Sequence, residues 1–297
     1  MKKYLCLLVV LITNSIVFSQ IPEMEKMALI ELYTSTGGDD WKESWDLSKD
    51  VSEWYGVEIK NDNVVSLSLM NNNLKGSLPE SIGAFNKLQV LNLAFNQIEG
   101  DLPKGIVELK NLMVLRLGKN RITGGIPYEI GSLRKLVILD LFSNKLSGIL
   151  PRGLFVLKNL KVLLVSDNNI TGRISEEIKD LTSLERLEIA NNNIYGDVPD
   201  SIGLLDNLKM MVLSENRLSG EFPSQVFSLP NLRALQIQGN RFDQERLRNS
   251  IPVDIDLVLF DFDKGTHKSE RDNFRDIYRK GDTRMVDTRF EEDKDNE

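Results

Sequence analysis

The chain has 297 residues, 41% of them hydrophobic, with one cysteine, one histidine and a formal net charge of −7 at pH 7. The negative balance argues against nucleic acid and anionic membrane surfaces as partners, and a single cysteine excludes a framework of internal disulfides. A chain of this length can bury a large core, so burial has to replace covalent cross-links.

Residues 1–19 are predicted to be a secretory signal peptide. Two lysines precede an apolar run that ends in small and polar residues, with cleavage expected near Ser19 or Gln20. A membrane anchor is the weaker alternative, because the apolar run is short for a bilayer span. Cys6 lies earlier in the run than a lipoprotein cysteine would. We therefore expect the mature chain to be exported to a periplasm, a cell surface or the medium.

Residues 20–63 are predicted to form an N-terminal cap with a helix. The apolar residues with a roughly helical spacing are Met24, Met27, Ala28, Ile30 and Leu32. The aromatic residues that follow are Trp41, Trp45, Trp54 and Tyr55. We predict that these aromatic side chains seal the open end of the next segment; the alternative is a platform for a sugar.

Residues 64–243 contain eight repeats with a period of 24 residues and the pattern LxxLxLxxNxLxGxLPxxIxxLxx. The repeats begin at Val64, Leu88, Leu112, Leu136, Leu160, Leu184, Leu208 and Leu232. A fixed period between 20 and 29 residues with this consensus is the signature of leucine-rich repeats. We therefore predict an α/β solenoid, a leucine-rich repeat superhelix with an N-terminal helical cap and a C-terminal cap.

Each position that recurs from repeat to repeat has a structural explanation. The leucines point inward, where burial of each contributes roughly 1.5–3 kcal/mol once neighbouring repeats stack on it. A column of asparagines is predicted to satisfy backbone groups left unpaired by the turn that follows each strand. These asparagines are Asn72, Asn96, Asn120, Asn144, Asn168, Asn192, Asn216 and Asn240. A glycine column, from Gly76 to Gly220, allows the next turn.

The array resembles the plant-type, extracellular class of leucine-rich repeats, in which an LxGxIP segment forms a second strand. The matching segments are 74–79, 98–103, 122–127, 146–151, 194–199 and 218–223. Repeat five departs from the pattern, with Ser175 in place of proline. The cap resembles the same family through WYGVEI, where Glu58 replaces a cysteine. The cysteine-free cap and short signal indicate a bacterial exported member.

Beyond the repeats, residues 244–263 are predicted to form a C-terminal cap. Apolar residues alternate from Ile251 to Leu259, which predicts a terminal strand over the last repeat. Residues 264–297 mix both charge signs, and Phe274, Ile277 and Tyr278 allow at most one short amphipathic helix. This composition predicts a solvated, largely disordered tail.

Side chains that alternate along each main strand are predicted to line a concave groove about 35 Å long. Within it, Phe95, Phe142 and Leu164 are apolar residues that the repeat does not require, and exposed aromatic residues are favoured binding anchors. The full set of predicted ligand-binding residues is Phe95, Arg116, Lys119, Asp140, Phe142, Leu164, Asp167 and Glu188. The alternative for the charged members is a solvated row of ion pairs, each contributing less than about 1 kcal/mol.

Catalysis is not expected. Asp140 and Glu188 lie two strands apart, roughly 9–10 Å, which overlaps loosely with the carboxylate separation of inverting glycosidases, but the strip they share is expected to be open to water. The one histidine, His267, lies in the tail, and there is no nucleophile set, metal cluster, cofactor motif or phosphate loop. We therefore predict an exported, non-catalytic recognition module for a protein or peptide ligand. The resemblance implies an alternative, a polysaccharide-binding adhesin or an inhibitor of a polysaccharide-degrading enzyme.

Overall fold

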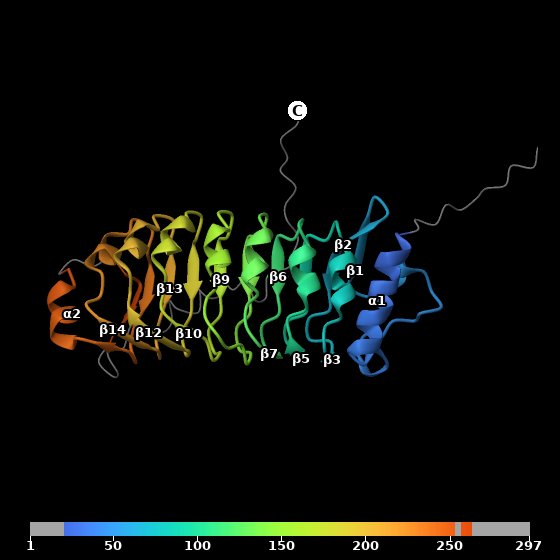
Figure 1. Cartoon of the computed structure of the whole chain (residues 1–297), viewed down its shortest axis with the longest axis horizontal. Helices are drawn as coiled ribbons and strands as arrows, with labels where there is room; N and C mark the ends of the chain where they lie inside the picture. Colours follow the sequence, from blue (N-terminus) through green and yellow to red (C-terminus); the bar gives the residue numbers. More distant parts are fainter. Residues whose placement is uncertain (1–20, 253–256, 263–297) are drawn as a thin grey trace, which may run out of the picture.

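The computed structural model describes residues 21–252 and 257–262, which form one elongated solenoid (Figure 1). Helix α1 (Glu23–Ser35) lies at one end and helix α2 (Gln244–Ser250) at the other. The predicted superhelix with a helical N-terminal cap is confirmed. The predicted signal peptide, the charged tail and the segment 253–256 lie outside the described residues.

One side of the solenoid is a ten-stranded sheet, parallel except for its first pair. Its strands, in spatial order, are β1 (Val57–Lys60), β2 (Asn63–Ser68), β4 (Val90–Asn92), β6 (Val114–Arg116), β8 (Ile138–Asp140), β9 (Val162–Leu164), β11 (Arg186–Glu188), β13 (Met210–Val212), β15 (Ala234–Gln236) and β17 (Leu259–Asp261). Residues 24 apart pair from β2 to β15, as Leu115 does with Leu139. The middle residue of each strand points into the core, and its two neighbours point outward. We call the outward side of this sheet the concave face.

The opposite, convex side consists of short 3-10 helices, one for each complete repeat. They are η3 (Glu80–Ala84), η4 (Lys104–Glu108), η5 (Tyr128–Ser132), η6 (Arg152–Val156), η7 (Glu176–Asp180), η8 (Asp200–Leu204) and η9 (Ser224–Ser228). A proline with extended backbone precedes each of them except η7. In η7 the Ser175 hydroxyl replaces the proline and accepts a hydrogen bond from the backbone N–H of Glu177.

The predicted second strands form two smaller sheets. One contains β3 (Lys75–Gly76), β5 (Gln97–Asp101) and β7 (Arg121–Thr123); the other contains β10 (Thr171–Gly172), β12 (Asn193–Asp197), β14 (Arg217–Gly220) and β16 (Arg241–Phe242). The prediction is wrong for repeat four, where residues 146–151 form no strand. Single backbone hydrogen bonds, such as Ser147 N–H to Gly124 O at 2.7 Å, connect that repeat to repeat three.

The asparagine column forms the predicted ladder between repeats. Asn168 is typical: its Nδ2 donates to the carbonyl oxygens of Leu141 and Val165, at 3.0 and 3.1 Å, and its Oδ1 accepts from Leu146 N–H at 2.9 Å. One amide group therefore satisfies backbone atoms of two repeats. At the N-terminal end of the ladder, Asn72 instead bonds the backbone of Glu43 in the cap.

Helix α1 covers the first repeat with only part of the predicted apolar set. Its buried residues are Glu25, Ala28, Leu29, Leu32 and Tyr33, whereas Met24 and Met27 are 71% and 62% exposed. The spacing of hydrophobic residues did not identify this face because Glu25 belongs to it. The Glu25 carboxylate accepts a hydrogen bond at 2.8 Å from the N–H of Val64, in β2. Burial of the carboxylate raises the pKa of Glu25, and this hydrogen bond opposes the shift.

The cap tryptophans seal the end of the solenoid, as predicted. Trp41, Trp45 and Trp54 are at most 5% exposed, and the rings of Trp45 and Trp54 stack at 4.8 Å. Tyr33 completes the cluster from α1. Tyr55 does not belong to it, because its side chain is 51% exposed. Since the tryptophans are buried, the alternative of a sugar platform at the cap is wrong.

The C-terminal end differs from the predicted continuous strand. Helix α2 follows repeat eight, and its Leu247 is buried while the Asp243 side chain caps its first turn. Strand β17 begins only at Leu259 and pairs in parallel with β15. Residues 251–252 and 257–258 are not in a strand. Of the alternating residues, Leu257 and Leu259 pack against the solenoid, and only Leu259 lies in a strand.

We expect Asn168→Ala to lower the free energy of unfolding by about 1–3 kcal/mol, because it leaves the backbone groups of Leu141, Val165 and Leu146 without their partner. Urea unfolding monitored by circular dichroism measures the change. Asn169→Ala is the matched control, because Asn169 is the next residue in the sequence and its side chain is exposed. Equal losses for the two variants would contradict a structural ladder.

We expect Glu25→Gln to reduce the pH dependence of stability. Burial holds the pKa of Glu25 above its ordinary value of 4.5, so the folded state retains a proton that the unfolded chain releases. The stabilisation from this group is complete below its ordinary pKa and is lost as the pH rises through the raised pKa. Glutamine keeps an acceptor for Val64 and carries no charge. The variant should therefore lose less stability than the parent between about pH 4 and pH 8.

Unfolding free energies across that range measure the effect of Glu25→Gln. Glu31→Gln, on the exposed side of the same helix, serves as the control and should leave the pH profile unchanged. Parallel profiles for Glu25→Gln and the parent would exclude the proposed proton linkage.

Candidate functional site on the concave face

Two columns of side chains dominate the concave face. In one column the register aligns Arg116, Asp140, Leu164 and Glu188 on the consecutive strands β6, β8, β9 and β11. The structure therefore brings four of the eight predicted site residues into one row. Neighbouring strands lie about 4.8 Å apart, so each side chain in the row lies beside the next.

An apolar cluster lies on the N-terminal half of this face. Its members, called the Phe142 cluster below, are Phe95, Ile138, Phe142, Val162 and Leu164. The Phe95 and Phe142 rings meet edge to face with centroids 6.0 Å apart. Phe142 reaches back over Gly118, where a Cβ would lie 2.3 Å from the ring. The missing side chain at position 118 therefore provides the space for Phe142.

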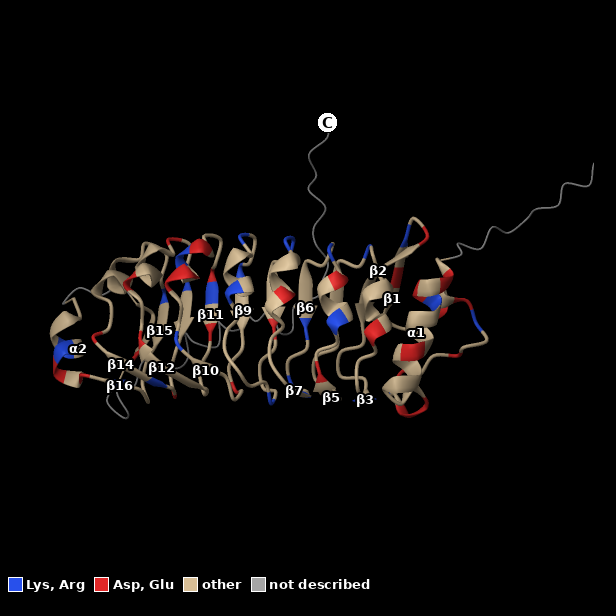
Figure 2. Ribbon diagram, viewed as in Figure 1, with Lys and Arg blue, Asp and Glu red and all other residues tan. Residues whose placement is uncertain are grey.

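Basic and acidic side chains border the Phe142 cluster. The Lys119 ammonium lies 5.8 Å from the Phe142 ring centroid, within the range of a cation–π contact. Asp140 accepts a hydrogen bond at 3.2 Å from the N–H of Phe142. Asp167 is exposed and accepts one at 2.6 Å from Asn191. Positive and negative residues alternate along the whole solenoid, and neither sign gathers at one end (Figure 2).

Glu188 forms a buried ion pair that the sequence did not predict. Its carboxylate lies 2.6 Å from Nε and 2.5 Å from Nη2 of Arg186, and each residue is 7% exposed. Arg186 occupies the outward column that is otherwise apolar on the central strands. Two features of the sequence could have predicted the pair. Arg186 is a charged residue in an apolar column, and it lies two residues from Glu188, which places both side chains on one face of β11.

The predicted exposure of the site residues is partly wrong. Phe142 and Leu164 are only 5% and 1% exposed, and Arg116 and Asp140 are 4% and 1% exposed. The close strand spacing and the space over Gly118 let these side chains pack against one another. The charged row is therefore not the solvated row of ion pairs that was the alternative. Lys119 and Asp167 are exposed, and Phe95 is half-buried.

A second apolar cluster lies beyond the ion pair, on the C-terminal half of the face. It is called the Met210 cluster below, and its members are Ala190, Met210, Val212, Ala234 and Leu259. The Arg186–Glu188 pair on β11 thus separates two apolar clusters. This arrangement suits an extended chain with apolar side chains at two points and polar groups between them.

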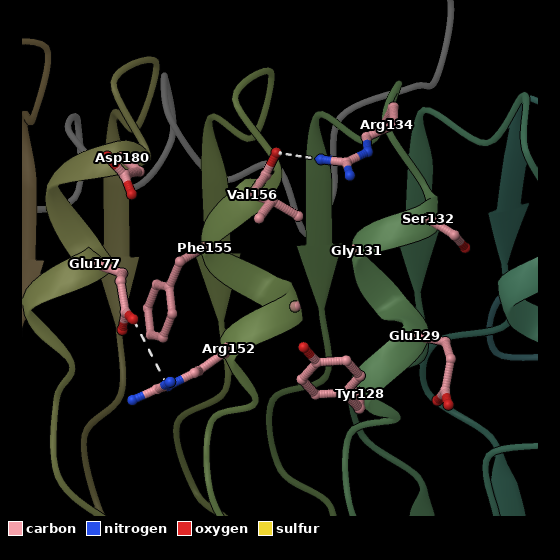
Figure 3. Close-up of a pocket in the computed structure, with 11 residues that line it drawn as sticks. Tyr128, Glu129, Gly131, Ser132, Arg134, Arg152, Phe155, Val156, Glu177 and Asp180 are labelled. Carbon is pink, nitrogen blue, oxygen red and sulfur yellow. Dashed lines mark hydrogen bonds and ion pairs between the residues drawn. The ribbon is translucent and has the colours of Figure 1, made fainter.

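The convex side has a separate pocket of about 470 Å³ across η5, η6 and η7 (Figure 3). Tyr128 is 66% exposed beside it, and Arg152 pairs with Glu177 at 3.6 Å. Gly153 is required for close packing here, because a Cβ would lie 1.9 Å from Tyr128 O. None of the eight predicted site residues lines this pocket.

Within residues 21–252 and 257–262, no cluster of three or more histidine, cysteine, aspartate or glutamate side chains is arranged to hold a metal ion. In the same part of the chain, no helix combines the length and the apolar character needed to cross a membrane. The two carboxylates considered for catalysis are also separated. The Glu188 carboxylate accepts a hydrogen bond from Arg186, and Leu164 lies between Glu188 and Asp140 in the same column.

Comparison with protein families identifies the repeats. Models described as leucine-rich repeats match residues 63–85, 87–109, 111–133, 135–157, 158–203 and 182–242. The chain therefore belongs to the leucine-rich repeat family. Its curated relatives include two probable receptor-like protein kinases and a STRUBBELIG-receptor family protein of Arabidopsis thaliana, and a nodulation receptor kinase of Pisum sativum, with 29% to 50% identity over the matched segments. The chain spans only 5% to 15% of the length of these relatives.

The solved structures that resemble the chain place it among plant-type extracellular repeats. The receptor kinase ectodomain of SOBIR1 from Arabidopsis thaliana is 32% identical, with a TM-score of 0.51 over 58% of this chain and 95% of that one. The Arabidopsis receptor kinase HAESA, in complex with the peptide hormone IDA and the co-receptor SERK1, is 32% identical, with a TM-score of 0.58 over 68% and 35%. A plant ice-binding protein is 28% identical, with a TM-score of 0.72 over 82% and 79%.

We expect Arg186→Met to lower the free energy of unfolding by about 3–5 kcal/mol at neutral pH, because it leaves the buried Glu188 carboxylate without its cation. The double variant Arg186→Met with Glu188→Leu should recover most of that loss. A double-mutant cycle by urea unfolding measures the coupling.

The exposed pair of Lys209 and Glu185, 2.6 Å apart, provides the control for this cycle. Lys209→Met should cost less than about 1 kcal/mol, since Glu185 keeps its second cation, Lys161 at 3.2 Å, and its partial contact with water. If both single variants lose the same stability, burial does not determine the effect of the Arg186–Glu188 pair.

Proposed function

We propose that this chain is an exported, non-catalytic recognition module that binds a protein or peptide on its concave face. The Phe142 cluster is the observation that carries the proposal. The repeat does not require aromatic side chains at positions 95 and 142, yet they meet on the concave face with Lys119 beside them. Aromatic and aliphatic groups bordered by charge are typical binding hot spots.

The structural relatives support the same proposal. HAESA binds a peptide hormone, and the structure of another relative, PEPR1, is a complex with AtPEP1. The conditions for catalysis are unfavourable here, because Arg186 neutralises Glu188 and Leu164 separates it from Asp140. A module that binds without chemistry is consistent with both observations.

Export is part of the proposal and rests on residues 1–19, whose lysines and apolar run are typical of a signal peptide. The likeness to the leucine-rich repeat ectodomain of the receptor kinase SOBIR1 also supports a position outside the cell. The suggested bacterial origin rests only on the short signal and the cysteine-free cap.

The alternative is a polysaccharide-binding adhesin or an inhibitor of a polysaccharide-degrading enzyme. The buried cap tryptophans no longer support it, so Asp140 and Glu188 are the groups left for a sugar. Ice binding gains no support either, because an ice lattice is regular. The column that starts at Lys75 and includes the outward residues of the second strands changes at every repeat, through Glu99, Thr123, Ser147, Thr171, Tyr195 and Ser219.

We expect Phe142→Ala combined with Leu164→Ala to weaken ligand binding at least about 30-fold, because it removes the centre of the Phe142 cluster. Pull-downs with residues 20–297 from surface and secreted extracts, followed by affinity measurement on the captured protein, test this. Lys119→Glu is a second variant, which leaves the buried packing intact and should also weaken binding.

Tyr128→Ala, on the convex side, is the matched control and should bind like the parent. Thermal unfolding verifies that each variant is folded. A glycan array is measured in parallel. Glycan binding that responds to Asp140→Asn and not to the Phe142 and Leu164 changes would replace the peptide proposal with the polysaccharide alternative.

A further inference from the structure

Both charge signs alternate over the solenoid as a whole, but the turns on one of its edges are uniformly basic over four repeats. The turns before β4, β6, β8 and β9, residues 86–89, 110–113, 134–137 and 158–161, contain six basic residues and no acidic one. The six are Lys87, Lys110, Arg134, Lys135, Lys158 and Lys161, and all are exposed. Figure 2 shows blue residues at the turns along the upper edge from β2 to β9. The first five residues are called the basic ridge below.

The two ends of this edge differ in charge. The next three turns, residues 182–185, 206–209 and 230–233, contain two basic and two acidic residues. The change of sign begins at Lys161, which pairs with Glu185 at 3.2 Å and so does not belong to the ridge. Positive charge therefore gathers on the turns of the N-terminal half.

Carboxylates leave the basic ridge largely unneutralised. Lys110 lies 3.5 Å from Glu108, but both side chains are more than half exposed, and such a pair is weak in water. In the part of the chain that the structure describes, neither Lys87 nor Lys158 forms an ion pair.

The other two cations of the ridge are bound by neutral groups. Arg134 Nη1 donates at 3.1 Å to the carbonyl oxygen of Val156 (Figure 3), and Lys135 Nζ donates at 2.8 Å to Oδ1 of Asn111. These hydrogen bonds orient the side chains and leave their charges in place.

A second set of asparagines fixes the spacing of the ridge. Asn111 Nδ2 donates at 2.7 Å to the carbonyl oxygen of Asn86, and Asn159 Nδ2 donates at 2.8 Å to that of Arg134. Each bond connects one turn to the turn before it. The backbones of Lys110, Arg134 and Lys158 therefore follow one another at about the strand spacing of 4.8 Å. The cations are held at a regular repeat before any ligand is present.

A regular line of exposed cations matches a linear polymer with anionic groups at a similar repeat. A polysaccharide with one carboxylate on each sugar has this property, because a sugar ring is about as long as the strand spacing. We propose that the basic ridge binds a linear acidic polysaccharide. Each exposed contact is weak, but one polymer chain engages several cations at once.

The convex pocket favours a polysaccharide over other polyanions. Arg134 belongs both to the ridge and to the lining of this pocket, and it bonds to Val156 on the next 3-10 helix, η6 (Figure 3). Val156 and Tyr128 are 40% and 66% exposed, and they offer an apolar surface to the C–H face of a sugar. A pocket of about 470 Å³ admits a sugar ring, but it is too small for a duplex nucleic acid or a membrane surface.

This site goes beyond the proposed recognition of a protein or peptide and does not depend on it. The ridge lies on the edge of the sheet and the pocket on the convex side, so the concave face stays open when both are occupied. The net charge of −7 repels any polyanion at long range, so binding has to come from contact with the ridge itself.

Binding of alginate, a linear polymer with one carboxylate on each sugar, to residues 20–297 tests the inference. Biolayer interferometry in calcium-free buffer measures the affinity. We expect binding at about 50 mM salt and a loss of at least about tenfold at about 300 mM, because salt screens the contacts. Alginate with esterified carboxylates should not bind. The absence of alginate binding at low salt, or equal binding of the esterified polymer, would overturn the inference.

Two triple variants locate the site. The first combines Lys87→Gln, Lys135→Gln and Lys158→Gln and should weaken alginate binding at least about tenfold, because it removes three charges of the ridge. The second combines Lys75→Gln, Lys104→Gln and Lys145→Gln, removes the same charge from exposed positions outside the ridge, and should bind like the parent. Thermal unfolding verifies that both variants are folded. Equal affinities of the two variants would contradict a site at the ridge.

Other polyanions and the concave face have separate readouts. Duplex DNA or vesicles of anionic lipid that bind more tightly than alginate, with the same dependence on the ridge, would overturn the assignment to a polysaccharide. Phe142→Ala combined with Leu164→Ala should leave alginate binding unchanged, and the ridge variant should leave capture of a protein ligand unchanged. Failure of protein capture alone therefore removes the proposed function, whereas failure of alginate binding alone removes this inference.

Discussion

The hydrogen bonds between the asparagine ladder and the backbone of neighbouring repeats control the rest of this structure. Asn144 donates to Leu117 O in the preceding repeat and accepts from Ile122 N–H, and the same bonds recur along the solenoid. They satisfy backbone groups that the turn would otherwise bury unpaired. Because each bond joins residues at a constant separation, the strands cannot slip. Every outward position therefore forms a straight column. The shape and chemistry of the surface depend on how the side chains vary along each column.

The concave face shows what this regularity allows. With strands about 4.8 Å apart, one glycine in a column gives room for a large side chain in the next repeat, and Phe142 fills the space over Gly118. The same closeness buries Arg186 and Glu188 together, although both face away from the core. Packing on this face thus resembles that of a protein interior, and its clusters are held in place before any ligand arrives. A preorganised surface loses little conformational entropy on binding.

The two ends of the solenoid are closed by different means. At the N-terminal end, α1 and stacked tryptophans cover the first repeat, and Glu25 supplies an acceptor to β2 where no earlier strand exists. At the C-terminal end, α2 covers the core while β17 extends the concave sheet by one more strand.

The sequence by itself determined the period, the solenoid, the inward leucines, the asparagine ladder and the columns in which Arg116, Asp140, Leu164 and Glu188 align. These follow from local spacing, and a constant period repeats the same environment eight times. Only the tertiary structure decided that Met24 and Met27 are exposed while Glu25 is buried, and that Phe142 and Leu164 are covered by their neighbours. It also decided that Arg186 neutralises Glu188. Burial and pairing depend on which side chains from other repeats fill the adjacent space, and spacing along one repeat carries no information about that volume.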